Sequence, residues 1–82
     1  MKGIFVFPNP SSGIFTIQLN NSTESEVVEI SIYSISGELI RTENKTTQST
    51  AELNLSDLDN GIYFIRVNMG ENDSYSRIVI LK

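Results

Sequence analysis

The sequence contains no cysteine, no histidine and no tryptophan. Cysteine and histidine are the side chains that most often bind a transition metal, act as a general base or attack a substrate as a thiolate. Disulfide bonds and thiolate metal sites therefore cannot hold the chain together. We expect 82 residues to form one small domain that depends on packing, and we expect it not to be an enzyme.

Positive charge is also scarce, because six lysine and arginine residues face ten aspartate and glutamate residues, for a net charge of −4. Nucleic-acid binding normally needs a basic stripe that displaces counterions, so we expect no nucleic-acid partner. No apolar run approaches the ~20 residues of a transmembrane helix. The apolar patch Ile4–Phe7 stops at Pro8 and is too short for a signal peptide. If the protein is exported, we expect this chain to be part of a longer precursor.

Apolar residues recur at every second position, and short polar turns separate these runs. Alternation with period two is typical of half-buried strands, and many short strands predict an antiparallel sandwich or barrel. We predict one all-β domain over residues 1–82 without a helix. Its seven strands are expected at Ile4–Phe7, Ile14–Leu19, Val27–Tyr33, Glu38–Thr42, Thr50–Leu55, Ile62–Asn68 and Ser74–Leu81.

Two segments, 20–26 and 43–49, are polar throughout and are predicted to be loops. The last strand differs from the others because its end, Ile78–Leu81, is apolar on both faces. A strand with two apolar faces is expected to be central or covered rather than a solvated edge.

Asp57, Asp59 and Asn60 precede Gly61, and oxygen ligands two residues apart before a glycine resemble part of a calcium loop. The EF-hand pattern requires a third ligand where this chain has Gly61 and a glutamate where it has Asn68. A turn stabilised by aspartate and asparagine side chains explains the segment better. We therefore predict no metal site and no cofactor.

Two other groups of residues have a functional interpretation. Glu24, Glu26 and Glu29 could act as paired carboxylates, but a solvated acidic edge is the simpler explanation. Tyr33 and Tyr75 could form a platform on which a sugar stacks, whereas Tyr63 falls in the buried register and is expected to pack in the core with a hydrogen-bonded hydroxyl. Serine-rich stretches have no histidine partner, so a serine nucleophile is not supported.

Gly37 and Gly61 each follow a polar turn and precede a strand. Both are expected to adopt a positive φ, where a Cβ atom is unfavourable. Replacing either by valine is expected to cost more than about 1 kcal/mol.

Four segments in this order resemble the C-terminal sorting domain of the type IX (Por) secretion system, type A, of Bacteroidetes. They are the Pro-Asn-Pro opening Val6–Gly13, the Tyr-x-x-x-Gly hairpin Ile30–Ile40, the Leu-x-x-Gly-x-Tyr segment Leu53–Val67, and the last strand ending at Lys82. The resemblance spans almost the whole chain. The motif residues with expected structural roles are Pro8, Asn9, Pro10, Gly13, Gly37, Leu58, Gly61 and Tyr63.

The resemblance implies a seven-stranded immunoglobulin-like sandwich that directs a larger precursor across the outer membrane. Its partners would be the type IX translocon and a sortase-like cysteine protease, which usually removes the domain and anchors the cargo at the cell surface. The protein would be exported, passing through the periplasm to the surface or the medium. The cargo and the cleavage site would lie upstream of residue 1. A structural or carbohydrate-binding accessory module is the alternative, because one fold serves several functions.

The translocon is expected to recognise the end of the last strand. The family pattern places two lysines near this end, whereas here the basic residues are Arg77 and Lys82, four apolar residues apart. A charged residue at each end of an apolar strand also discourages aggregation, which is the alternative explanation. Recognition could use the backbone edge of the strand, its terminal carboxylate or a patch formed with its neighbours. The candidate residues are Arg77, Ile78, Val79, Ile80, Leu81 and Lys82.

Overall fold

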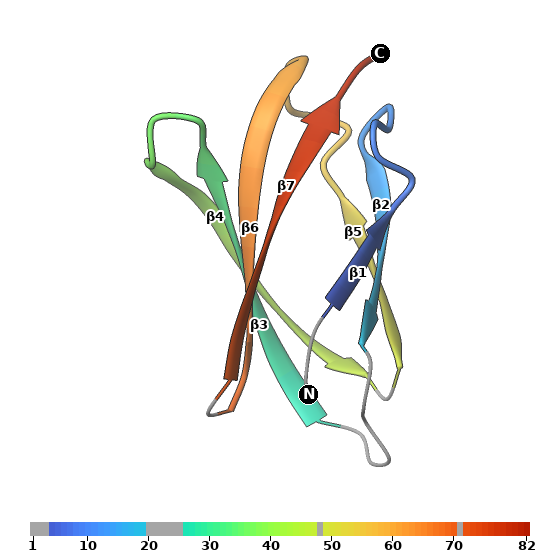
Figure 1. Cartoon of the computed structure of the whole chain (residues 1–82), viewed down its shortest axis with the longest axis vertical. Helices are drawn as coiled ribbons and strands as arrows, with labels where there is room; N and C mark the ends of the chain where they lie inside the picture. Colours follow the sequence, from blue (N-terminus) through green and yellow to red (C-terminus); the bar gives the residue numbers. More distant parts are fainter. Residues whose placement is uncertain (1–3, 20–25, 48, 71) are drawn as a thin grey trace.

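A computed structural model describes residues 4–19, 26–47, 49–70 and 72–82. These residues form seven strands in two antiparallel sheets that pack as a sandwich (Figure 1). One sheet has the order β1-β2-β5 and the other β4-β3-β6-β7. The all-β, immunoglobulin-like prediction is confirmed. The strands are β1 (Ile4–Phe7), β2 (Ile14–Leu19), β3 (Glu26–Ser34), β4 (Leu39–Thr47), β5 (Thr50–Asn54), β6 (Gly61–Met69) and β7 (Asn72–Ile80).

The core lies between the two sheets and consists of the apolar residues that alternate along the strands. β2 and β5 supply one layer, and β3, β6 and β7 supply the other, as the aligned packing of two twisted sheets requires. Its completely buried side chains are Phe15, Ile17, Ile30, Ile32, Leu53, Leu55, Ile65, Val67, Ile78 and Ile80.

Strand β4 is longer than predicted, because most of the polar segment 43–49 continues the strand to Thr47. Arg41, Glu43 and Lys45 pair with Ile32, Ile30 and Val28 of β3 and therefore share their core-facing side. Glu43 pairs with both basic neighbours, at 3.7 Å from Arg41 and 3.6 Å from Lys45. The prediction of a loop was wrong because charged side chains fill the inward positions of this edge strand, which hides the period-two pattern. Inward charges of this kind protect a sheet edge.

Strand β7 lies at the border of its sheet, so a central position for it is excluded. Its C-terminal half is nevertheless covered, because Ser11 forms a parallel bridge with Ile80. Figure 1 shows β1 and the segment that follows it on this side of β7. The expectation of a covered strand is therefore correct for the end of β7, although the cover is a short segment and not a full strand.

Candidate functional site

The candidate recognition residues divide into two sets according to the face of β7 on which they lie. Ile78 and Ile80 are completely buried in the core. Arg77 and Leu81 are exposed, and Val79 between them is half-buried on the same outer side. Successive side chains of a strand point to opposite faces, which accounts for this division. Of the six candidate residues, a partner of the folded domain can therefore touch four, which are Arg77, Val79, Leu81 and Lys82.

The final residue is held by the corner between β5 and β6. The Lys82 backbone N–H donates to Asn60 Oδ1 at 3.0 Å, and Lys82 Nζ donates to the Ser56 carbonyl at 2.8 Å. Each of these bonds joins segments more than 20 residues apart. The chain end therefore has a defined position on the surface although it lies beyond the last ladder pair.

The outer edge of β7 is filled by the Pro-Asn-Pro segment. Asn9 Nδ2 donates to the Arg77 carbonyl and Asn9 Oδ1 accepts from the Val79 N–H, both at 2.9 Å. The Ser11 N–H donates to the Val79 carbonyl at 3.0 Å, and the Ser11 carbonyl accepts from the Leu81 N–H at 2.8 Å. The peptide bonds before Pro8 and Pro10 are both cis. Four hydrogen bonds thus join the first motif of the sequence to the last.

A tight corner follows this contact. Ser11 Oγ accepts from the Gly13 N–H at 3.1 Å and donates to the Ile14 carbonyl at 2.6 Å. Gly13 has a φ of +133°, and a Cβ atom built on it would lie 2.6 Å from the Ser56 backbone Cα. Because the Gly13 carbonyl also accepts from the Leu55 N–H at 2.7 Å, no side chain fits here.

The Leu-x-x-Gly-x-Tyr motif forms the neighbouring corner. Leu58 and Tyr63 are half-buried and pack against the core. The Tyr63 hydroxyl donates to the Asp59 carbonyl at 2.8 Å, so the predicted packing with a satisfied hydroxyl is confirmed. Gly61 has a φ of +155°, at the margin of extended backbone. Gly37, at +93°, lies clearly in the region expected for it, within the turn between β3 and β4.

Two of the three side chains proposed as part of a calcium loop, those of Asp57 and Asn60, have protein partners. Asp57 Oδ2 accepts from Arg41 Nη2 at 2.5 Å, and this hydrogen bond is the main cause of a lowered pKa of the Asp57 carboxyl. Asn60 Oδ1 is occupied by Lys82. The described part of the chain contains no group of three or more acidic side chains that could hold a metal ion.

The acidic trio Glu24, Glu26 and Glu29 lies largely outside the described residues. Glu24 lies outside the described residues, as does the side chain of Glu26. Glu29 is exposed on β3.

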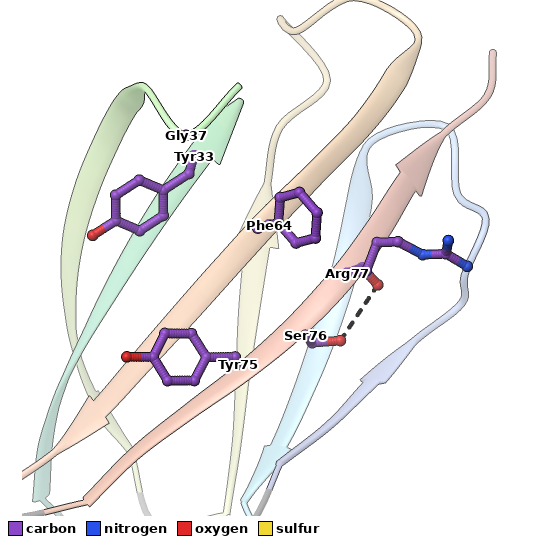
Figure 2. A pocket seen from close by; sticks show the side chains of 6 residues that line it. All are labelled: Tyr33, Gly37, Phe64, Tyr75, Ser76 and Arg77. Atoms are coloured by element: carbon purple, nitrogen blue, oxygen red, sulfur yellow. Dashed lines mark hydrogen bonds between the residues drawn. The ribbon is translucent and has the colours of Figure 1, made fainter. Parts of the chain in front are cut away.

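An aromatic groove lies on the outer face of the four-stranded sheet. Tyr33 of β3, Phe64 of β6 and Tyr75 of β7 line an open hollow of about 470 Å³ together with Gly37, Ser76 and Arg77. Figure 2 shows the three rings spread over neighbouring strands, while the Arg77 guanidinium points away from them. The structure thus brings Tyr33 and Tyr75 onto one face, as a stacking platform requires. Phe64 belongs to this face, although the sequence interpretation considered only tyrosines.

Arg66 lies beside this groove, opposite Tyr75 in the ladder between β6 and β7. A hydrogen bond with the Tyr33 side chain and the attraction of Asp73 raise the pKa of Arg66 above its ordinary value. Arginine is positively charged throughout the ordinary pH range, so the sheet face that carries the groove also carries a positive charge next to Tyr75.

The role of Asn9 was not predicted, although its motif was recognised. An available signal was its place between two prolines, which have no N–H to donate. The asparagine amide carries both a donor and an acceptor and can take the place of a peptide group. No feature of the sequence indicates that Asn9 binds to β7.

Comparison with known proteins identifies what these motifs belong to. A family model described as "Secretion system C-terminal sorting domain" matches residues 5–81. The chain belongs to this family. It is also 34% identical over 82 residues to the ulvan lyase NLR42 of Nonlabens ulvanivorans. That alignment covers 99% of this chain and 15% of the relative, so the chain spans less than a sixth of the length of that protein.

Family membership confirms the resemblance seen in the four motifs. The chain is a C-terminal sorting signal of the type IX secretion system, and it serves export to the cell surface or the extracellular space. In the described residues of the sorting domain, no helix is long and apolar enough to cross a membrane.

Proposed function

We propose that the type IX translocon recognises the sorting domain through the outward-facing side chains at the end of β7. The residues that would make this contact are Arg77, Val79, Leu81 and Lys82. The observation that carries the proposal is the way in which the chain end is held. Asn60 and Ser56 fix Lys82, and Asn9 and Ser11 fix the strand before it. A fixed, exposed chain end gives a partner a surface that needs little further ordering on binding.

We further propose that the domain carries a larger cargo and has no catalytic activity of its own. The 15% share of the relative that it covers is consistent with a small domain joined to a much longer protein. Removal of the domain by a sortase-like cysteine protease, with attachment of the cargo at the surface, would complete export. The bond cut in this step would lie between the cargo and the sorting domain.

An export assay tests this function. A signal peptide and a fluorescent cargo are fused before residues 1–82 and expressed in a host with an active type IX system. We expect the fusion to reach the surface or the medium, and the R77A/K82A variant to remain folded in the periplasm. The matched control is N44A/T46A, which removes two exposed side chains from β4. Export of R77A/K82A at the rate of the parent fusion would contradict the recognition proposal. If the parent fusion itself is stable but stays in the periplasm, the sorting function fails for this chain.

The aromatic groove supports a second candidate function, which is binding of a carbohydrate. Tyr33, Phe64 and Tyr75 present aromatic surface on one sheet face, and Tyr75 is 68% exposed. The relative is named an ulvan lyase, so ulvan is a suitable probe. We expect Y75A to weaken retention of the purified domain on immobilised ulvan, with Y63F as the control because Tyr63 packs against the core. Equal retention of the parent and Y75A on immobilised ulvan would contradict this function.

A further inference from the structure

The outer edge of β7 between Arg77 and Leu81 is closed by a segment from the other end of the chain. We propose that this edge is a strand-pairing surface which Asn9 and Ser11 keep closed, and that a second copy of the chain pairs with it when it is opened. The edge also stays closed during sorting, so that the translocon contacts the side chains of β7 and not its backbone edge. This second part rests on the function proposed above.

The closure covers four consecutive outward backbone groups, from the Arg77 carbonyl to the Leu81 N–H. In an edge strand, the N–H and C=O groups of every second residue point outward and lack a ladder partner. Here these residues are Arg77, Val79 and Leu81. The Arg77 carbonyl, both backbone groups of Val79 and the Leu81 N–H are all satisfied by Asn9 or Ser11.

The closing segment is built so that it ends as soon as the edge is covered. Pro8 and Pro10 flank Asn9 and cannot donate a hydrogen bond, so the asparagine side chain supplies the donor and acceptor that a strand residue would offer. Ser11 adds the one parallel backbone bridge, to Ile80. The segment therefore satisfies the edge without offering a new edge of its own.

The sequence beneath the closure explains why a second copy is the partner expected on opening. Ile78–Leu81 is a run of four apolar residues with strong preference for β structure. Such a run on an open edge is a template for pairing with another chain. Val79 is half-buried and Leu81 is exposed, so both add apolar surface to that edge. A second copy of the chain offers the same backbone groups and the same apolar side chains. Two copies of β7 can therefore satisfy each other.

Amide hydrogen exchange of the chain alone tests the closure without the secretion system. The variant N9A is compared with the control N68A. The control also removes an exposed hydrogen bond made by an asparagine side chain, from Asn68 Nδ2 to Asp73 Oδ1 at 2.5 Å. We expect N9A to raise the exchange rate of the Val79 amide at least about tenfold, while the Ile78 amide, which alternates toward β6, changes little. We also expect N9A to form dimers in sedimentation at concentrations where the parent and N68A are monomers. Unchanged protection of Val79, or an N9A chain that opens but stays monomeric, would overturn the proposal.

A reversible crosslink tests whether the edge stays closed during sorting. Ser11 and Ile80 are paired across the bridge, so S11C/I80C places two cysteines within reach of a disulfide. Because both substitutions alter buried positions, the oxidised variant is compared with the same variant kept reduced. The oxidised fusion is expected to be exported with its disulfide intact, at a rate within about twofold of the reduced one. Retention of the oxidised form in the periplasm, with the reduced form exported, would show that the edge must open and would overturn this part of the proposal. If the parent is not exported either, the sorting function fails, while the exchange result still decides whether the edge is closed.

Discussion

At the scale of single residues, Gly13 and Gly37 separate two reasons for which a glycine is required. Both have a positive φ, but a Cβ atom would strike the Ser56 backbone only at Gly13, whereas the space around Gly37 is open within 4 Å. We expect G37A to cost about 1–2 kcal/mol of unfolding free energy, from backbone strain alone. G13A adds a steric clash and is expected to cost about 1–3 kcal/mol more. Urea unfolding of both variants measures the difference, and an equal loss would show that the clash relaxes without cost.

The pair Arg41–Asp57 gives a prediction with a defined pH dependence. The hydrogen bond from Arg41 lowers the pKa of Asp57 in the folded state below its ordinary value of 3.8. The pair therefore stabilises the fold above pH values near 4, and this contribution is lost as the pH falls through the lowered pKa. We expect D57N to have a slightly lower thermal unfolding midpoint than the parent at pH 7 and the same thermal midpoint near pH 2.

Asp59→Asn is the control, because the Asp59 side chain makes no ion pair or hydrogen bond with the described residues. An effect of D57N that is independent of pH would contradict an electrostatic origin. Because the Asp57 side chain is 64% exposed, the effect is expected to be small and to shrink further in high salt.

At the scale of elements, most strands follow from alternation because one of their faces is apolar. β2 and β6 show this clearly, with Phe15 and Ile17 or Ile65 and Val67 facing the core. Alternation did not predict the full length of β4, because its inward positions after Ile40 are charged. This strand forms because it pairs with β3. The closure of β7 was also beyond the sequence, because its hydrogen bonds join residues 68 and 70 positions apart.

The two faces of β7 predict opposite effects for neighbouring substitutions. Ile78→Ala removes completely buried side-chain atoms and is expected to cost about 2–5 kcal/mol. Val79→Ala changes the outer face and is expected to cost less than about 1.5 kcal/mol, yet to reduce export of the fluorescent fusion. Thermal unfolding together with the export assay separates the two effects. A V79A domain that is stable and fully exported would remove Val79 from the recognition surface.

At the scale of the whole molecule, the two ends of the chain complete one structure. The opening motif reaches β7 through Asn9 and Ser11, and the last residue reaches the corner that precedes β6 through Asn60. The family motifs could be recognised from the sequence, but their mutual contacts could not, because each motif has a local explanation as a turn or a strand. Only the fold shows that the opening motif, the Leu-x-x-Gly-x-Tyr motif and the last strand are joined by hydrogen bonds.

This arrangement predicts that the fold requires the end of the chain. A chain ending at Asp73 loses Ile78 and Ile80 from the core, leaves the edge of β6 without its neighbour and deprives Asn9 and Ser11 of their partners. We expect it to show no cooperative unfolding transition and poor amide dispersion, whereas the full-length R77A/K82A chain unfolds cooperatively. A cooperative transition in the shortened chain would show that β7 is dispensable for the fold. With β7 required, a receptor that recognises the outward side chains at the end of this strand accepts only domains in which β7 is present and folded.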